Sequence, residues 1–181
     1  MKTLGDMIVS TTLTNQTKEK YRLAARGIIY DNAKVLMIYS SYYNDCTFPG
    51  GGVENGEDIK VALERECSEE AGILVKNIRP FYKTIEKREL DKESYLIHES
   101  HFFLCDIEKH VSQHLETYEV ALGYKPVWIS VDEAIKINTE KINLLNDKDY
   151  KGVLERELRI LTKLKENGFW FLFSFVFRPS Y

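Results

Sequence analysis

The stretch GGGVENGEDIKVALERECSEEAG, from Gly50 to Gly72, constrains the fold and the chemistry of this chain more than any other segment. Asn55-Gly56 marks a tight turn, and a helix is predicted from about Asp58 to Ala71, with Gly72 just past its C-terminus. The three glycines that open the stretch let the backbone come close to an ion or a ligand. The stretch therefore predicts a glycine loop that leads into a helix.

This helix concentrates negative charge on one side. Steps of about 100° per residue place Glu66, Glu69 and Glu70 within one arc of about 100°, and Glu66 and Glu70 lie one above the other as like charges. A solvated acidic face is the commonest fate of such glutamates. The alternative is a divalent cation, because hard carboxylate oxygens suit Mg²⁺, Mn²⁺ or Ca²⁺. The neighbouring arc is apolar and is expected to pack against a sheet: Leu63, Cys67 and Ala71.

The rest of the chain alternates strand patterns with helix patterns. Residues 22–30 and 34–39 flank the turn signal Asp31-Asn32 and predict a β-hairpin, and Ser130 begins a capping signature for a short helix. The predicted order is hairpin 22–39, loop 40–57, helix 58–71, strand-rich stretches 73–87 and 93–106, loop 107–124, strand 125–130, helix 131–137 and helix 148–165. We predict one α/β domain over residues 1–181, with a mixed sheet and helices on both faces.

The C-terminal segment FWFLFSFVF, residues 169–177, is almost entirely apolar. It is far too short to span a bilayer. The simplest interpretation is an added strand or a packed end of the chain. An interface with a second copy, and hence a homodimer, is the alternative, because such a segment would promote aggregation if it were left exposed.

Composition excludes several classes of partner. The net charge of −3 argues against a general surface for a nucleic acid polymer or a membrane, which would need a basic excess. The three cysteines lack metal-ligand spacing and fit a reducing compartment. No secretory signal is recognised at the N-terminus, so a cytoplasmic location is predicted.

The acidic helix and its glycine loop resemble a known family pattern in full. The Nudix hydrolase box reads G-x5-E-x7-R-E-U-x-E-E-x-G-U, where U is bulky or apolar, and it is matched over residues 51–73. The matching residues are Gly51, Glu57, Arg65, Glu66, Cys67, Glu69, Glu70, Gly72 and Ile73. The resemblance implies a Nudix-type α/β/α sandwich with a mixed central β-sheet.

The resemblance also implies a reaction and roles for residues. Nudix enzymes use Mg²⁺ or Mn²⁺ to hydrolyse a phosphoanhydride in a nucleoside diphosphate linked to another group. Carried over by position, Glu66, Glu69 and Glu70 are the metal-binding carboxylates, and the Gly50 carbonyl is a further ligand. Glu57 and Arg65 form the pair that orients the catalytic helix. These five side chains, together with the backbone of Gly50, make up most of the predicted site.

The general base stays open among four glutamates, because its position varies within the family. Glu66 and Glu69 are the candidates inside the box, and Glu116 and Glu119 are the candidates in the later loop. For the loop pair, plain solvation is the alternative to catalysis. Glu119 is taken as the loop member of the predicted catalytic set.

Other side chains are weaker candidates for substrate contact. Arg26 in the first strand is predicted to meet a phosphate, with a structural ion pair as the alternative. Tyr43, like Tyr42, precedes the glycine loop and is a candidate for stacking on a base, although loop tyrosines are common on surfaces. His98 and His101 are three residues apart, so a regular strand would point them to opposite faces, and they are not read as a ligand pair.

Two functions are compatible with these features. The first is a metal-dependent pyrophosphohydrolase that acts on a small nucleotide-type substrate. Nucleoside triphosphates, nucleotide sugars and ADP-ribose all stay open, because no signature of a substrate subfamily is recognised. The second is a Nudix-like module that senses a nucleotide without cleaving it. Such a module would be expected to lose carboxylates of the box, whereas this chain keeps them all.

Overall fold

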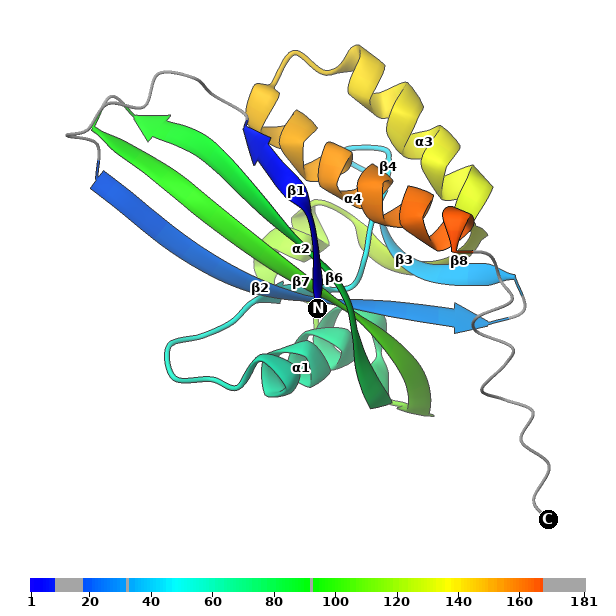
Figure 1. Ribbon diagram of the computed structural model, residues 1–181. Helices are drawn as coiled ribbons and strands as arrows, with labels where there is room; N and C mark the ends of the chain where they lie inside the picture. The colour runs from blue at the N-terminus through cyan, green and yellow to red at the C-terminus, as the bar shows by residue number, and fades with distance from the viewer. Residues whose placement is uncertain (9–17, 32, 92, 168–181) are drawn as a thin grey trace.

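The computed structural model describes residues 1–8, 18–31, 33–91 and 93–167 (Figure 1). The strands are β1 (Lys2–Ile8), β2 (Lys18–Asp31), β3 (Lys34–Ser40), β4 (Asp45–Thr47), β5 (Gly50–Gly52), β6 (Ile73–Asp91), β7 (Ser94–His110) and β8 (Tyr124–Ser130). The helices are α1 (Ile59–Ala71), α2 (Thr117–Ala121), α3 (Val131–Leu144) and α4 (Lys148–Glu166). The apolar segment 169–177 lies outside the described residues, so its two interpretations stay predictions.

The strands form a mixed sheet with the order β1-β6-β7-β2-β3-β4. β6 and β7 are antiparallel, whereas β1 runs parallel to β6 and β7 runs parallel to β2. β5 pairs with the middle of β2, and β8 pairs with β3. This arrangement confirms the predicted α/β class with a mixed central sheet.

Helices cover both faces of the sheet (Figure 1). α1 packs on one face, where Leu63 and Cys67 are fully buried in a cluster that includes Phe103 of β7. α3 and α4 pack on the other face, where Ile160 is buried in a second cluster that includes Phe102. Because Phe102 and Phe103 are consecutive in β7, their side chains point to opposite faces. The predicted packing of the apolar stripe of α1 against the sheet is confirmed.

The boundaries of α1 agree closely with the sequence pattern. The side chain of Asp58 accepts a hydrogen bond of 2.9 Å from the N–H of Lys60 and so caps the N-terminus. Gly72 ends the helix in the left-handed conformation, with a φ of 65°. The predicted hairpin is also present, since Tyr30 pairs with Val35 and Asp31 with Lys34.

Several predicted boundaries are wrong. The predicted loop 40–57 contains β4 and β5, and the predicted loop 107–124 contains the end of β7 and the short helix α2. The helix predicted to end near residue 137 continues to Leu144, because Asn138 is fully buried and binds the backbone of Cys46 through its side-chain amide. β1 was not predicted at all. No helix in the described parts of the chain is long and apolar enough to cross a membrane.

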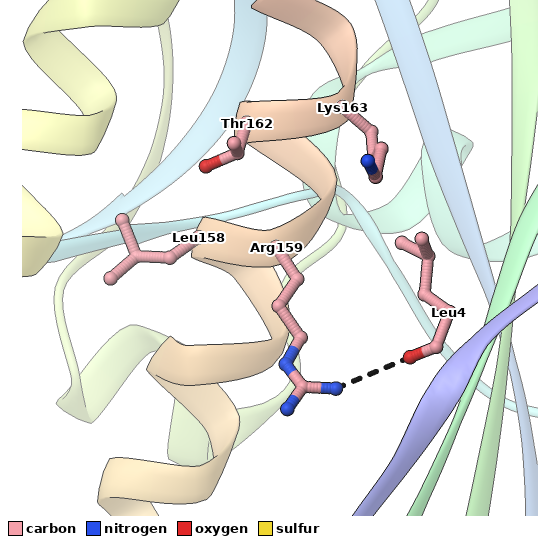
Figure 2. Close-up of a pocket in the computed structure, with 5 residues that line it drawn as sticks. All are labelled: Leu4, Leu158, Arg159, Thr162 and Lys163. Carbon is pink, nitrogen blue, oxygen red and sulfur yellow. Dashed lines mark hydrogen bonds between the residues drawn. The ribbon is translucent and has the colours of Figure 1, made fainter. Parts of the chain in front are cut away.

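α4 also contacts the N-terminal strand β1 (Figure 2). Arg159 donates a hydrogen bond of 3.2 Å to the carbonyl oxygen of Leu4. A pocket of about 360 Å³ lies beside this bond and is lined by Leu4, Leu158, Arg159, Thr162 and Lys163. These lining residues include no carboxylate, so this pocket is not the predicted catalytic site.

Candidate active site

A second cavity, of about 550 Å³, lies where α1, α2, α4 and β8 approach the glycine strand β5 and β2. Its lining is rich in charge and in aromatic rings. The carboxylates that line it are Glu54, Glu66, Glu70 and Glu116, and the tyrosines are Tyr118, Tyr124 and Tyr150. This cavity brings the predicted catalytic helix and the predicted glycine loop together.

The glycines of β5 allow a close approach between this strand, β2 and α1. Gly50 has a φ of 135°, and its N–H donates a hydrogen bond of 2.7 Å to the carboxylate of Glu70. A Cβ added at Gly51 would lie 2.4 Å from Oε1 of Glu66. The carboxylates of α1 therefore lie directly against the backbone of β5, in space that a side chain would fill.

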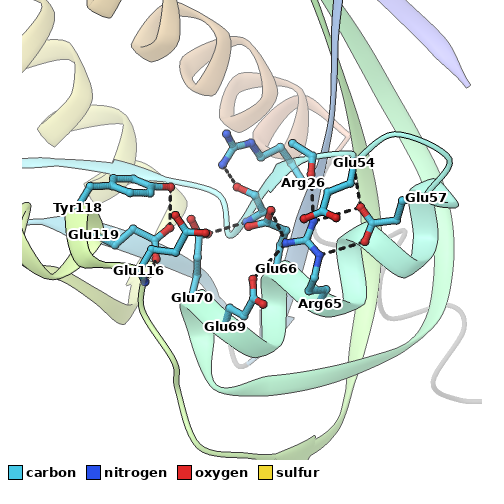
Figure 3. Close-up of polar contacts among 12 residues, drawn as sticks. Arg26, Glu54, Glu57, Arg65, Glu66, Glu69, Glu70, Glu116, Tyr118 and Glu119 are labelled. Carbon is cyan, nitrogen blue, oxygen red and sulfur yellow. Dashed lines mark hydrogen bonds and ion pairs between the residues drawn. The ribbon is translucent and has the colours of Figure 1, made fainter.

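Arg65 is the centre of the polar contacts on α1 (Figure 3). Its Nε and Nη2 donate to the two oxygens of Glu57 at 3.0 and 3.2 Å, which is a bidentate ion pair. Its Nη1 donates to Glu66 at 2.9 Å and to Glu69 at 3.1 Å. The hydrogen bond from Arg65 also holds the pKa of Glu57 below its usual range. The structure thus places Glu57 and Arg65 in the predicted contact.

The carboxylates that face the cavity carry an electrostatic cost. Burial, and to a smaller extent the negative charges of Glu66 and Glu119, raise the pKa of Glu70 to about 8. Burial also raises the pKa of Glu66, although Arg65 opposes the shift. A cation placed beside these groups would offset both the repulsion and the desolvation.

The donor set fits a hard divalent cation. Within the described residues, no three His, Cys, Asp or Glu side chains are already gathered as a metal cage. Glu66 and Glu69 contact Arg65 instead, and Glu70 contacts the N–H of Gly50. Glu66, Glu69 and Glu70 nevertheless lie on one helix, and burial beside the glycine strand raises the pKa of Glu66 and Glu70. Carboxylate oxygens are the ligands that Mg²⁺ and Mn²⁺ prefer.

Arg26 lines the cavity and contacts the glycine strand. Its Nη1 donates to the carbonyl oxygens of Phe48, at 3.2 Å, and of Gly50. The Gly50 carbonyl, a predicted metal ligand, is therefore occupied by a guanidinium here. Arg26 is held by backbone carbonyls rather than by the carboxylate partner that the alternative interpretation expected.

The two loop candidates for the general base lie in different environments. Glu119 is only 3% exposed, and its oxygens accept hydrogen bonds from the Tyr118 hydroxyl at 2.9 Å and from the N–H of Glu116 at 2.8 Å. Glu116 is exposed and lines the cavity, as does Tyr118. Figure 3 shows both glutamates on the side of the site next to α2.

Tyr43 is not among the residues that line the cavity. Its ring stacks on Tyr150 with a centroid distance of 4.2 Å, and Tyr150 does line the cavity. The Tyr150 hydroxyl in turn donates to the buried carboxylate of Asp45. Tyr43 therefore packs against Tyr150 outside the cavity lining, and Tyr150 is the ring of this pair that a ligand in the cavity can contact.

Asp45 is expected to make stability depend on pH. Burial raises the pKa of Asp45 to about 6, although the hydrogen bond from Tyr150 opposes the shift. The folded state therefore binds this proton more tightly than the unfolded state, so ionisation lowers the free energy of unfolding as pH rises from about 4 to 6, by about 2 kcal/mol. Urea unfolding of wild type and Asp45→Asn across this range should show that the substitution removes this fall. Parallel pH profiles for the two proteins would contradict the assignment.

The two histidines of β7 lie on opposite faces of the sheet, as predicted. His98 is 5% exposed and faces α4, whereas His101 contacts Glu99 on the other face at 2.6 Å. Burial and nearby arginines lower the pKa of His98 to about 2, so it is neutral. The two rings do not form a ligand pair.

Several residues that line the cavity were not predicted from the sequence. Arg22 lies four positions before Arg26 in β2, so the alternation of a strand places both on one face, and this signal was available. Tyr150 and Arg156 come from α4. No local pattern links them to residues some 90 positions earlier, because the docking of α4 on the sheet is a tertiary contact.

Comparison with known proteins supports a family assignment. The RNA pyrophosphohydrolase of Hydrogenovibrio crunogenus is 27% identical over 122 residues, which cover 64% of each chain. The mouse diphosphoinositol polyphosphate phosphohydrolase 3-alpha is 33% identical over 107 residues, 58% of this chain and 59% of the relative. The chain thus spans less than two thirds of the length of these curated relatives.

Among solved structures, a NUDIX hydrolase from Nitrosomonas europaea is similar with a TM-score of 0.48 and 19% identity, over 66% of this chain and 79% of that chain. The family model of the NUDIX domain matches residues 20–148. This match covers most of the chain and includes β2 to α3, with the whole of the acidic helix. The chain therefore belongs to the Nudix hydrolase family.

Proposed function

We propose that this protein is a divalent-metal-dependent pyrophosphohydrolase that cleaves a phosphoanhydride in a nucleoside diphosphate linked to another moiety. One observation carries the proposal. Glu66 and Glu70 line a cavity of about 550 Å³, beside a glycine strand and a partly buried Arg65–Glu57 pair that orients the helix. We place the whole activity in one domain over the full chain.

The carboxylates of Glu66, Glu69 and Glu70 would hold Mg²⁺ or Mn²⁺. When bound, the ion would neutralise phosphate charge and lower the pKa of a water molecule. The carbonyl of Gly50 accepts a hydrogen bond from Arg26, and its second lone pair could serve as a further ligand. Arg26 already lines the cavity, so a phosphate oxygen is a suitable alternative partner for its guanidinium.

Arg65 acts as a positioning residue rather than as a catalytic one. Its five hydrogen bonds connect Glu57, the Gly52 carbonyl and two carboxylates of α1. These contacts fix the rotamers of Glu66 and Glu69 before a substrate arrives. Preorganisation of this kind lowers the cost of assembling the site.

Of the two loop glutamates, Glu116 is a better candidate than Glu119 for the general base. Its carboxylate is exposed to the cavity, whereas both oxygens of Glu119 already accept hydrogen bonds within α2. We therefore assign Glu119 to holding the loop, and Glu116 joins Glu66 and Glu69 as a candidate for accepting the proton of the attacking water. Geometry is the first requirement for a general base, and pKa is the second.

The proposed substrate is a small nucleotide-type molecule, and a nucleic acid polymer or a membrane is not expected as a partner. The net charge of −3 supports this choice, because it offers no basic surface for a polymer. The relatives named above act on RNA and on diphosphoinositol polyphosphates, according to their names. A cytoplasmic location is part of the proposal, and a homodimer through segment 169–177 stays the alternative to a packed end of the chain.

A screen of the purified protein tests the proposed function. We expect cleavage of at least one member of a panel of nucleoside triphosphates, nucleotide sugars and ADP-ribose in the presence of Mg²⁺ or Mn²⁺. The products are a nucleoside monophosphate together with pyrophosphate from a triphosphate, or with a sugar phosphate from the other two classes. EDTA should reduce the rate to background, because the carboxylates then lack their cation, and added metal should restore it. The rate is measured by colorimetric phosphate detection, after inorganic pyrophosphatase for the triphosphates and after alkaline phosphatase for the nucleotide sugars and ADP-ribose, which have no terminal phosphate until they are cleaved.

Two outcomes would count against the proposal. Cleavage that persists in excess EDTA would refute the metal requirement. Binding of a nucleotide without any cleavage, with metal present, would favour the alternative of a nucleotide-sensing module. The intact set of box carboxylates argues against that alternative.

A further inference from the structure

The sheet face beneath α4 contains polar side chains where a core would be apolar. Glu86 of β6 lies opposite His98 of β7, and His98 lies beside Arg22 of β2 in the same register. α4 adds Arg156, which is 1% exposed, and Glu157, which is fully buried. A row of charged and polar groups thus runs across three strands towards the active-site cavity.

Arg156 is the member of this row that is incompletely bonded. Its Nε and Nη2 donate to Glu157 at 3.0 and 2.8 Å. Its Nη1 is buried, makes no hydrogen bond, and lies 3.9 Å from the nearer oxygen of Glu86. Because a buried N–H without an acceptor carries a desolvation cost, this group has unused capacity for an anion. Arg156 lines the active-site cavity, but Nη1 itself has no exposed surface, so a ligand would reach this group only after the guanidinium turns from Glu86 towards the cavity.

Two other arginines line the same part of the cavity. Arg26 extends from β2 (Figure 3), and Arg22 extends from the same face of that strand, four residues earlier. The guanidinium of Arg22 lies close to β5, since a Cβ added at Gly52 would be 3.5 Å from its Nη2. Partial desolvation, followed by the charges of Arg26 and Arg156, lowers the pKa of Arg22, which places the three positive charges near one another.

Within the row, Glu86 and Glu157 balance the charges of Arg22 and Arg156, and Arg26 adds a further positive charge at the cavity. His98 is neutral, and both its ring nitrogens lack a hydrogen-bond partner. The cavity therefore has an acidic part, formed by Glu66 and Glu70, and a basic part, formed by the three arginines. A ligand that satisfies both parts carries phosphate groups at two places.

We propose that Arg22 and Arg156, together with Arg26, form a second phosphate-binding subsite, so that the preferred substrate carries a phosphate beyond the diphosphate that is cleaved. The inference rests on the proposed function and narrows its substrate class to small polyphosphorylated molecules. Arg156 belongs to α4, which lies outside the residues 20–148 that match the family domain. The C-terminal helix of this chain therefore supplies part of the specificity.

Guanidinium chemistry explains the selectivity. Arginine presents a planar fork of N–H donors that matches phosphate oxygens, and each charge-assisted bond is stronger than a neutral one. A nucleotide sugar or ADP-ribose would leave Nη1 of Arg156 buried without an acceptor. Sites that contain an unsatisfied polar group discriminate strongly against such ligands.

The test compares the binding of inorganic tripolyphosphate and inorganic pyrophosphate by calorimetry, in EDTA, so that no catalysis is needed. Wild type should bind tripolyphosphate at least about tenfold more tightly than pyrophosphate. Arg22→Gln should reduce this ratio by about tenfold, and Arg156→Gln should do the same. Arg159→Gln removes the same charge from an exposed position of α4 that contacts Leu4, outside the cavity, and should leave the ratio unchanged.

A kinetic comparison completes the test. With Mg²⁺, kcat/KM for adenosine tetraphosphate should exceed that for ADP, and Arg22→Gln should abolish the difference. Because Arg156 is buried against Glu157, circular dichroism checks that Arg156→Gln folds. Arg22 is exposed, so Arg22→Gln is expected to fold and keeps the test decisive. An unchanged tripolyphosphate preference in folded Arg22→Gln would overturn the subsite. Selective binding without hydrolysis of any substrate would instead support the subsite and refute the proposed catalysis.

Discussion

Replacing Glu69 with glutamine is expected to lower the rate of hydrolysis by about two to three orders of magnitude, because a carboxylate of the metal site contributes several kcal/mol of charge stabilisation. The fold should remain intact, since the side chain is 38% exposed and contacts only Arg65, at 3.1 Å. Steady-state kinetics with Mg²⁺ measures the rate, and thermal unfolding monitored by circular dichroism measures stability.

Glu64 provides a matched control for this substitution. It lies on α1 one residue before Arg65 and, like Glu69, is not among the residues that line the cavity. Unlike Glu69, it is exposed and forms no ion pair with Arg65 within the described residues. Glu64→Gln removes the same charge from the same helix and should leave kcat within about twofold of wild type, as for other surface substitutions. Full activity of Glu69→Gln, or an equal loss in both variants, would show that Glu69 has no special role in catalysis.

Replacing Gly50 with alanine is expected to destabilise the folded state by about 3 kcal/mol or more. An added Cβ would lie 2.1 Å from the carbonyl oxygen of Ala25, and the φ of 135° is one that L-residues rarely adopt. Since the clashing atom belongs to the backbone of β2, a rotamer change cannot relieve the contact. Urea denaturation with a two-state fit measures the loss in the free energy of unfolding.

Gly56→Ala separates backbone strain from the clash. Gly56 also has a positive φ, of 80°, but an added Cβ there would meet no atom within 4 Å. This variant should cost only about 1 kcal/mol, the strain of a left-handed residue. If Gly50→Ala were no more destabilising than Gly56→Ala, the close approach of β5 to β2 would be refuted.

The elements predicted correctly are those whose signals are local. α1 has a capping aspartate, an apolar stripe and a terminal glycine, and each of these features acts within a few residues. The hairpin of β2 and β3 has a turn signal between two apolar runs. For the same reason the Arg65–Glu57 pair could be predicted, because both residues belong to one contiguous motif.

The elements that were missed depend on long-range contacts. β5 consists of three glycines, which have no strand propensity, and it is a strand only because its backbone pairs with residues 24–26 of β2. β1 pairs only with β6, some 80 positions away. No sequence pattern singles out Arg156, and its burial follows from the polar face of β6 and β7 beneath it.

The register of β2 has a consequence for how this scaffold can change its ligand. Arg22 and Arg26 are four residues apart in a continuous strand, so their Cα atoms are separated by about 13 Å. Main-chain bonds to β7 fix both positions, and bonds to β5 fix the second of them again. A substitution at position 22 or 26 therefore changes the functional group that contacts a ligand. The distance between the two Cα atoms stays the same. Single substitutions at Arg22 or Arg26 can therefore change which ligand the cavity binds without any rearrangement of α1.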